Sequence, residues 1–229
     1  MVSLSNHERE FVRPSTSSGR TNILVVAAVP QELQDFRSAG LQGVHRLVTG
    51  MGRAAGQAVL QRLSAGDVGL VVSAGFAGGA RPGFKTGDLV LASEVIQASF
   101  GERSRPDPSF FSLSDKASVG PFVTVDKPLA DPEAKAWAGN RFGAIAVEME
   151  TAWVARSAEA AGVAWVGIRA ILDPMEYLLR VHSPAQALRC AASPGRWGEF
   201  SDFLGRIRTA GRSLADGLHD LMERRKRWI

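Results

Sequence analysis

Short, uninterrupted hydrophobic runs alternate along this chain with amphipathic or small-residue segments. The runs at 22–29 and 68–73 are rich in Val, Ile and Leu, which is typical of strands that are buried on both faces. The same pattern predicts further strands at 44–48, 89–96, 123–125, 144–147 and 163–171, and helices at 54–63, 131–137 and 150–161. Because strands and helices alternate, we expect an α/β fold with a mostly parallel or mixed sheet.

The C-terminal part carries a different pattern. From Trp197 onward, apolar residues recur at helical spacing opposite a polar face, which predicts an amphipathic helix within the basic segment 196–229. The end of this segment, 224–229, is strongly cationic and contains Trp228. A last helix that packs on the sheet explains the pattern. A helix that contacts anionic lipid explains it too, because basic residues and Trp are typical of membrane-surface helices.

Polar segments delimit one domain. Residues 1–21 are Ser-rich and lack periodicity, so we predict a disordered tail, and residues 99–121 contain three prolines and resemble a long surface loop. The remainder, 22–229, is long enough to fold as a single domain with a substantial core. No hydrophobic run reaches the about 18 residues of a membrane span, and the N-terminus has no apolar signal core. We therefore expect a cytoplasmic protein. A peripheral contact of its basic C-terminal helix with a membrane is an alternative that the sequence leaves open.

Composition and charge exclude several classes of function. The single cysteine, Cys190, excludes an intrachain disulfide framework and a cysteine zinc site, and we expect no metal and no cofactor. The formal net charge of +4 comes from the ends, because residues 22–195 carry sixteen basic and sixteen acidic side chains. A neutral body argues against a nucleic-acid groove.

Four acidic side chains follow predicted strands. Glu32 lies just past the first strand, Glu148 and Glu150 lie where a strand gives way to a helix, and Asp173 ends the next strand. Ligands of open α/β sheets bind at the carboxyl ends of strands, so these acids are candidates for a functional site. The first three are equally compatible with exposed first-turn acids, which the helix dipole favours.

Two glycine-rich segments also follow predicted strands. Thr49-Gly50-Met51-Gly52-Arg53 precedes a helix, so its backbone amides could approach a ligand oxygen, and Arg53 is a candidate neighbour of a phosphate or water site. A solvated helix residue explains Arg53 as well. The segment 74–80 contains three glycines directly after a buried strand, which indicates a close approach of a ligand to the backbone.

Taken together, these motifs resemble one known family. AAVPQE, TGMGRA, SAGFAGG followed by Lys-Thr-Gly-Asp, and AIAVEMET with VGIRAILD occur in one order over about residues 22–175. This arrangement is similar to the nucleoside phosphorylase superfamily, in its branch of methylthioadenosine/S-adenosylhomocysteine nucleosidases, futalosine hydrolases and hopanoid-associated phosphorylase-like proteins. The resemblance implies a three-layer α/β/α sandwich with a central mixed sheet, assembled as a homodimer, that acts on a small-molecule nucleoside.

The resemblance also implies a role for each site residue. Glu32 matches the acid that positions or activates the attacking water, and Asp173 matches the acid that protonates the purine at N7. Glu150 matches the acid that takes the sugar hydroxyls. The substrate-binding residues that the resemblance implies are Ala77, Gly78, Glu148, Met149 and Glu150. The implied activity is hydrolysis of the N-glycosidic bond of a 5′-modified adenosine-type nucleoside, and these residue types suit it, because a protonated carboxyl can neutralise the leaving base while a carboxylate stabilises the sugar cation.

This chain departs from the family pattern at three positions. Leu172 and Phe76 stand where the nucleosidases have serines, and Pro128 stands near the place of an aromatic residue that stacks on adenine. Three alternatives therefore stay open: phosphorolysis in place of hydrolysis, a hopanoid-associated enzyme that acts on a lipid-linked adenosine, and a nucleoside-binding protein without catalysis. The segment after Asp173 favours the hopanoid-associated relatives, whereas Glu32 in place of a glycine-and-arginine phosphate grip favours hydrolysis.

Overall fold

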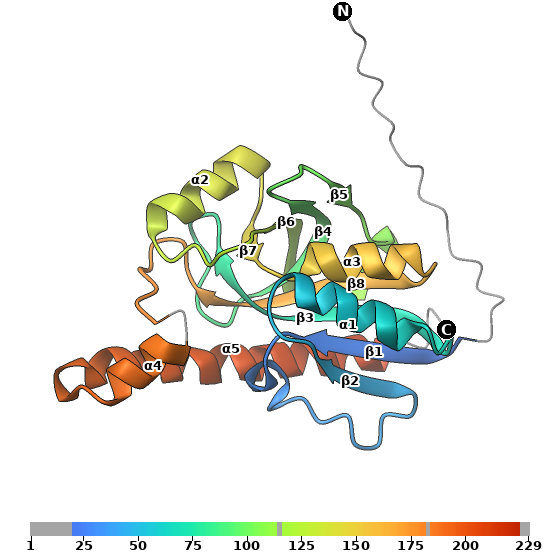
Figure 1. Ribbon diagram of the computed structural model, residues 1–229, viewed down its shortest axis with the longest axis horizontal. Helices are drawn as coiled ribbons and strands as arrows, with labels where there is room; N and C mark the ends of the chain where they lie inside the picture. Colours follow the sequence, from blue (N-terminus) through green and yellow to red (C-terminus); the bar gives the residue numbers. More distant parts are fainter. Residues whose placement is uncertain (1–19, 114–115, 182–183, 225–229) are drawn as a thin grey trace, which may run out of the picture.

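A central mixed sheet with helices on both faces makes up the fold in the computed structural model, which describes residues 20–113, 116–181 and 184–224 (Figure 1). The strand order is β2-β1-β3-β7-β6-β4-β5, and β8 pairs with both β3 and β4. Most pairs are parallel, whereas β8 runs antiparallel to β4 and β7 runs antiparallel to β3. The three-layer α/β/α sandwich that the sequence predicted is thereby confirmed.

Strands and helices follow one another in an irregular alternation. The strands are β1 Asn22–Ala27, β2 Val44–Val48, β3 Val68–Gly79, β4 Leu89–Gln97, β5 Arg103–Ser104, β6 Ala117–Thr124, β7 Ala146–Glu148 and β8 Ala164–Asp173. The α-helices are α1 Arg53–Leu63, α2 Pro132–Phe142, α3 Thr151–Ala160, α4 Pro184–Ala191 and α5 Trp197–Arg224, and the 3-10 turns are η1 Pro30–Leu33, η2 Pro108–Leu113 and η3 Pro194–Arg196.

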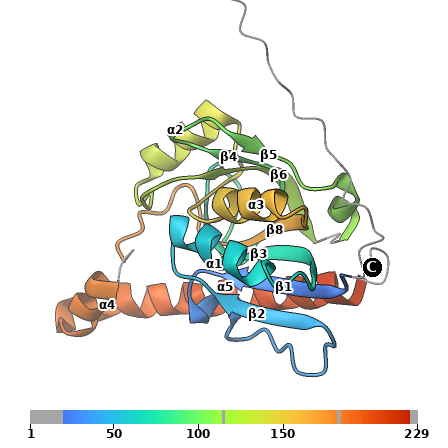
Figure 2. The same ribbon diagram turned by 45° about the vertical axis from the view of Figure 1, so that its right-hand side comes forward.

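The two faces of the sheet bury two different hydrophobic clusters. Helices α1 and α3 lie side by side on one face, and α5 runs along the other (Figures 1 and 2). Because successive side chains of a strand point to opposite faces, β3 and β8 contribute to both clusters. Ala77 and Ile171 pack with α1 and α3, whereas Phe76 and Leu172 pack with α5. The two positions that depart from the nucleosidase pattern therefore lie on the α5 face.

Several elements are longer than the sequence indicated. The glycine-rich segment is no loop, because β3 continues through it to Gly79 and pairs with β8 as far as Gly78 and Asp173. Helix α2 passes the predicted end at 137 and stops at Gly143, whose φ of 69° suits glycine. The predicted surface loop 99–121 contains β5, η2 and the first residues of β6, and Phe110 of η2 is buried.

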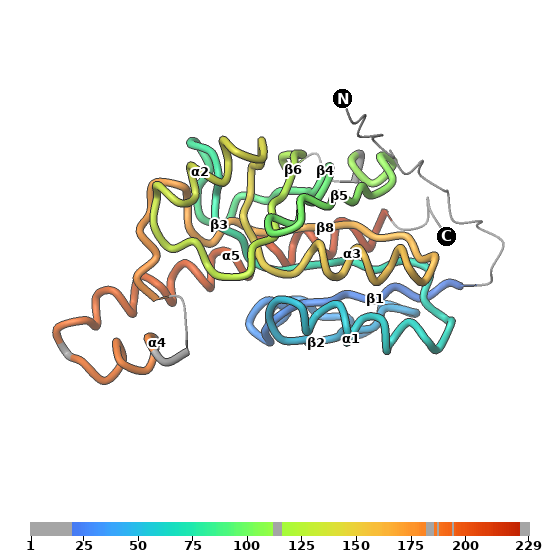
Figure 3. The backbone as a smooth tube through the Cα atoms, turned by 45° about the horizontal axis from the view of Figure 1, so that its top comes forward, coloured from blue at the N-terminus to red at the C-terminus, as the bar shows by residue number. Residues whose placement is uncertain are grey.

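Helix α5 belongs to the core of the domain. Leu214, Leu218, Leu221 and Met222 are buried against the sheet, which agrees with a packed last helix. Its first turns and α4 project from the body of the molecule (Figure 3). Among the described residues, no helix is long and apolar enough to cross a membrane. Most of the predicted tail and the cationic end, 1–19 and 225–229, lie outside the described residues.

Candidate active site

Glu32 reaches from the end of β1 to β3. Pro30 opens a single 3-10 turn, and the turn brings the Glu32 carboxylate back over the strand end, where it accepts the N–H groups of Ala28 at 2.8 Å and Val29 at 3.1 Å. Its other oxygen accepts the N–H of Phe76 at 2.8 Å. Burial raises the pKa of Glu32, and Arg169 and these hydrogen bonds partly offset the rise. Glu32 is thus a buried acid, not an exposed first-turn residue.

Gly75 makes room for this carboxylate. A Cβ atom at position 75 would lie 2.6 Å from Glu32 Oε1, well inside contact distance. From the sequence, the three glycines of 74–80 indicated that a ligand approaches the backbone. At Gly75 the group that approaches is a side chain of the protein itself.

Glu148 is the most fully bonded acid of the site. Its carboxylate at the end of β7 accepts the guanidinium of Arg169 at 2.7 Å, the N–H and Oγ1 of Thr151, both at 2.7 Å, and the N–H of Glu150 at 3.0 Å. The hydroxyl of Thr124 also donates to it. Because these donors occupy the carboxylate, Glu148 serves to hold the start of α3 and Arg169 in place.

Arg169 is a functional candidate that the sequence analysis did not single out. It is buried in β8, where it donates to the carbonyl of Ser73 at 2.8 Å as well as to Glu148. Within the described part of the chain, its Nε is a buried polar atom without a hydrogen-bond partner. Its positive charge lowers the pKa of both Glu32 and Glu150. The available signal was a single arginine in an otherwise apolar strand, VGIRAILD.

Glu150 stands at the N-cap position of α3 but does not cap that helix. Its side chain turns away and accepts the N–H of Gly52 at 3.0 Å, at the start of α1. Burial raises the pKa of Glu150 to about 7, and the charges of Glu148 and Glu32 contribute to the rise. The TGMGR turn and the AIAVEMET motif, which lie far apart in the sequence, therefore meet at this carboxyl group.

Asp173 ends β8 and pairs with a buried lysine. Lys135 of α2 donates to Asp173 Oδ2 at 2.8 Å. Burial raises the pKa of Asp173 to about 6, although the nearby charges of Lys135 and Arg206 oppose the rise. Gly78 lies alongside, since a Cβ there would come within 3.3 Å of Asp173 Oδ2. Lys135 was not predicted either, because α2 shows no hydrophobic pattern that would mark it as buried.

The remaining predicted residues lie in different surroundings. Ala77 is buried on the α1 and α3 face, and Met149 is half-buried beside a small cluster that includes Val147. Arg53 is exposed, and its guanidinium lies 4.8 Å from the ring centre of Trp153 and 5.7 Å from that of Phe100. This stacking occupies the face of the Arg53 guanidinium with aromatic rings.

Strand β3 relates the acids to one another. Glu32 abuts Gly75 and Asp173 abuts Gly78, and three residues of a strand span about 10 Å. Glu150 is close enough to Glu32 for the charge of Glu32 to raise its pKa. Glu32 and Asp173 thus lie along one stretch of β3, and Glu150 lies near Glu32. No group of three side chains that could bind a metal occurs among the described residues.

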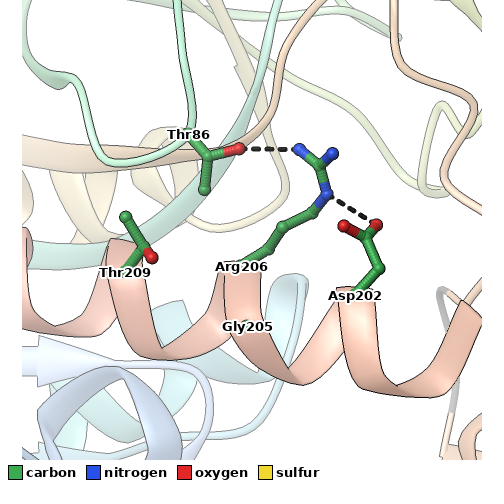
Figure 4. A pocket seen from close by; sticks show the side chains of 5 residues that line it. All are labelled: Thr86, Asp202, Gly205, Arg206 and Thr209. Atoms are coloured by element: carbon green, nitrogen blue, oxygen red, sulfur yellow. Dashed lines mark hydrogen bonds and ion pairs between the residues drawn. The ribbon is translucent and has the colours of Figure 1, made fainter. Parts of the chain in front are cut away.

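A cavity of about 350 Å³ lies on the α5 side (Figure 4). It is lined by Thr86, Asp202, Gly205, Arg206 and Thr209. Arg206 donates to Asp202 at 2.9 Å and to Thr86 at 2.7 Å, and Thr86 in turn donates to the carbonyl of Leu172. None of the site residues predicted from the sequence lines this cavity. Through Thr86, however, the cavity wall contacts the carbonyl of Leu172, the residue before Asp173.

Comparison with known proteins gives one family and many similar folds. The family model described as "Phosphorylase superfamily" matches residues 37–186. No curated protein is significantly similar to the chain in sequence.

The solved structures that resemble this chain include nucleosidases. A mutant of the Helicobacter pylori 5′-methylthioadenosine/S-adenosylhomocysteine nucleosidase, with 5′-methylthioadenosine in its active site, has a TM-score of 0.70 and 18% identity over 88% of this chain and 98% of that one. Futalosine hydrolase of the same organism has a TM-score of 0.71 and 17% identity over 89% and 98%. The Streptococcus pneumoniae nucleosidase has a TM-score of 0.67 and 20% identity over 89% and 99%. At these identities the likeness establishes the fold.

Proposed function

Because the chain belongs to the phosphorylase superfamily, we propose that it is a purine nucleosidase, which hydrolyses the N-glycosidic bond of a 5′-modified adenosine-type nucleoside. The observation that carries the proposal is the set of three buried acids, Glu32, Glu150 and Asp173, of which Asp173 has a pKa raised to about 6 and Glu150 a pKa raised to about 7. Groups that can hold or release a proton near neutral pH are what acid-assisted cleavage needs. The nucleosidase folds among the similar structures support the same reaction class.

Asp173 is the proposed general acid. With a pKa of about 6, roughly a tenth of Asp173 is protonated at pH 7, and the fraction rises as the pH falls. Its proton moves to N7 of the purine while the bond between the base and the anomeric carbon breaks. General-acid assistance of this kind is worth about 10²–10⁴-fold in rate.

Glu32 and Glu150 serve the sugar side of the reaction. The Glu32 carboxylate is fixed by three backbone N–H groups, so it can orient a water molecule and accept its proton as the oxygen bonds to the anomeric carbon. Glu150 can accept two hydroxyls of the ribose, and its charge stabilises the sugar cation. The reaction needs Asp173 protonated while Glu150 is ionised, and with pKa values of about 6 and about 7 a part of the molecules meets both conditions near pH 6 to 7.

The charges of the site favour water over phosphate as the nucleophile. Glu32 and Glu150 would repel an incoming phosphate anion. Arg53, the cation that follows the glycine turn, stacks on Trp153 and Phe100. Both features support hydrolysis.

Release of free base from 5′-methylthioadenosine, S-adenosylhomocysteine and adenosine, measured by liquid chromatography with and without phosphate, tests the proposal. We expect phosphate-independent release, with free sugar as the second product. Formation of a sugar 1-phosphate would overturn hydrolysis, and nucleoside binding without turnover would favour a non-catalytic binding protein.

A lipid-linked nucleoside is the second candidate substrate. Leu188 of α4 and Trp197 of α5 lie on the projecting part of the molecule with exposed fractions of 72% and 60%. Such side chains suit contact with a lipid surface. Deleting 196–229 would not test this, because α5 contributes to the core. Co-sedimentation with phosphatidylglycerol vesicles, compared between the wild type and a Leu188→Ser/Trp197→Ser variant, is the suitable experiment, and equal pelleting of both proteins would contradict the lipid contact.

A further inference from the structure

Lys135 is the lysine of α2 that lies wholly inside the molecule, with an exposed fraction of 0%. Its Nζ donates to Asp173 Oδ2 at 2.8 Å, to the carbonyl of Pro174 at 2.7 Å and to the carbonyl of Tyr177 at 2.6 Å. An ammonium group has three hydrogens, and here each one has an acceptor. The geometry therefore suits a charged lysine whose position is fixed by its three bonds.

The surroundings keep this lysine in place. Its stem packs against β3, where a Cβ on Gly78 would lie 3.3 Å from Lys135 Cδ. The carbonyls of Pro174 and Tyr177 belong to the segment that follows Asp173, so one ammonium group ties the acid and the start of that segment to α2. Asp131 is the N-cap of helix α2, because its carboxylate accepts a hydrogen bond from the N–H of Ala134 at 2.7 Å.

We propose that Lys135 is a positioning residue for the reaction proposed above, which holds Asp173 and stabilises its carboxylate as the proton moves to the leaving base. This inference rests on the proposed function. In the transfer, the O–H bond of Asp173 breaks, the N7–H bond of the purine forms, and the negative charge left on Asp173 faces the ammonium. In the reactive complex Asp173 carries the proton, and the charge that faces Lys135 develops as this proton moves, so Lys135 stabilises the transition state more than that complex.

The same arrangement decides the charge that Asp173 carries in the free protein. The cations that face it are Lys135 from α2 and Arg206 from α5, and Lys135 has the larger effect on its pKa. Without Lys135, less positive charge would oppose the rise in the pKa of Asp173 that burial causes. Its pKa would rise further above 6, and the pH at which the reaction rate falls would move upward with it.

Lys135→Met is the direct test, with Arg141→Met as its control. Arg141 is an exposed cation six residues further along the same helix, so both variants lose one positive charge from α2. We would measure kcat and kcat/KM for base release from pH 5 to pH 9. The titration of Asp173 would be followed by ¹³C NMR in substrate-free protein labelled at aspartate.

For Lys135→Met we expect kcat at pH 5, where Asp173 is protonated in both proteins, to fall about 10- to 100-fold, the loss of one charge-assisted hydrogen bond. We also expect the Asp173 titration and the alkaline limb of kcat/KM to move upward by at least about one pH unit. Lys135→Arg should restore part of both, and Arg141→Met should change neither. If Lys135→Met does not fold, Lys135→Gln carries the same expectations, because its amide can still donate to the loop carbonyls.

Unchanged kcat in the neutral variants would overturn the inference. A lower kcat with an unmoved Asp173 titration would overturn it too, because Lys135 would then support the fold alone. These results differ from a failure of the proposed function, in which the wild-type chain itself releases no base. The NMR titration would in that case still decide whether Lys135 sets the charge on Asp173.

Discussion

Replacing Glu150 with Gln should stabilise the protein at alkaline pH. The pKa of Glu150 is raised from 4.5 to about 7, so the folded chain holds the Glu150 proton more tightly than the unfolded chain does. As the pH rises through this window, the unfolded chain loses its proton first and the wild type loses stability. A difference of 2.5 pH units corresponds to about 3 kcal/mol at 1.36 kcal/mol per unit.

Glutamine keeps the acceptor for the Gly52 N–H, 3.0 Å away, and removes the buried charge. We expect the free energy of unfolding of Glu150→Gln, relative to the wild type, to rise by about 3 kcal/mol between pH 4.5 and pH 8.5. Urea denaturation followed by circular dichroism measures this difference. In melting temperature, the effect at pH 8.5 would be on the order of 10 °C for a chain of this size.

Glu133→Gln is the matched control, because Glu133 is an exposed acid in the first turn of α2. Its effect should stay within about 1 kcal/mol, with little dependence on pH over this range. If the stabilities of Glu150→Gln and the wild type run parallel from pH 4.5 to pH 8.5, Glu150 is not a buried acid with a raised pKa. The electrostatic account of the site would then be wrong.

Three further predictions follow from the same geometry. Asp173→Asn should lower base release by at least about 100-fold. Wild-type release should be highest between about pH 6 and pH 7, because Asp173 must carry a proton while Glu150 is ionised, and a flat pH–rate profile would exclude Asp173 as the acid. Gly75→Ala should lower the rate of base release about 100-fold, because the added methyl group would lie 2.6 Å from the Glu32 carboxylate and displace it. A variant that releases base at the wild-type rate would contradict the role of Glu32. Phe76→Ser and Leu172→Ser should each destabilise the fold by about 2 kcal/mol in urea denaturation. The ratio of kcat/KM values for adenine and hypoxanthine nucleosides should stay the same, since both residues pack with α5, and a changed ratio would place them beside the base.

The sequence predicted the fold class because its central strands are continuous apolar runs. The runs at 22–29 and 68–73 are typical of strands covered on both faces, and a mixed sheet between two helical layers covers them in this way. Pattern alone did not show that β3 continues to Gly79. That extension depends on pairing with β8 and β7, which no local feature of a glycine-rich segment reveals.

The acids could be predicted from the sequence, but their partners could not. Glu32 and Asp173 follow β1 and β8, which run parallel to β3, so their place at one edge of the sheet follows from the topology. Glu150 follows β7, which runs antiparallel to β3, and its nearness to Glu32 could not be predicted from the strand pattern. Lys135 and Arg169 are buried cations, and charged residues are almost never buried unless paired, so a sequence without coordinates places them outside. Lys135 pairs with Asp173, 38 residues away in the sequence, and Arg169 pairs with Glu148, 21 residues away.

Glu148 and Glu150 could not be told apart from the sequence. From the sequence both were compatible with first-turn residues of a helix, as Glu32 was. In the structure Glu148 is occupied by Arg169, Thr151 and Thr124, whereas Glu150 turns to Gly52. Strand β7 ends at Glu148 and Glu150 stands at the N-cap of α3, so the change from strand to helix separates the two side chains, and Glu150 is the residue that we propose for the sugar.

Hydrolysis of 5′-methylthioadenosine in water enriched in ¹⁸O tests the central claim most directly. If Glu32 orients water while Asp173 protonates the base, the released sugar should carry one ¹⁸O atom at its anomeric carbon before exchange, in the absence of phosphate. Mass spectrometry of early time points reads this out. Two results would contradict the account. One is a nucleoside that binds in the active site and is not cleaved, and the other is a sugar product that carries phosphate in place of the labelled oxygen.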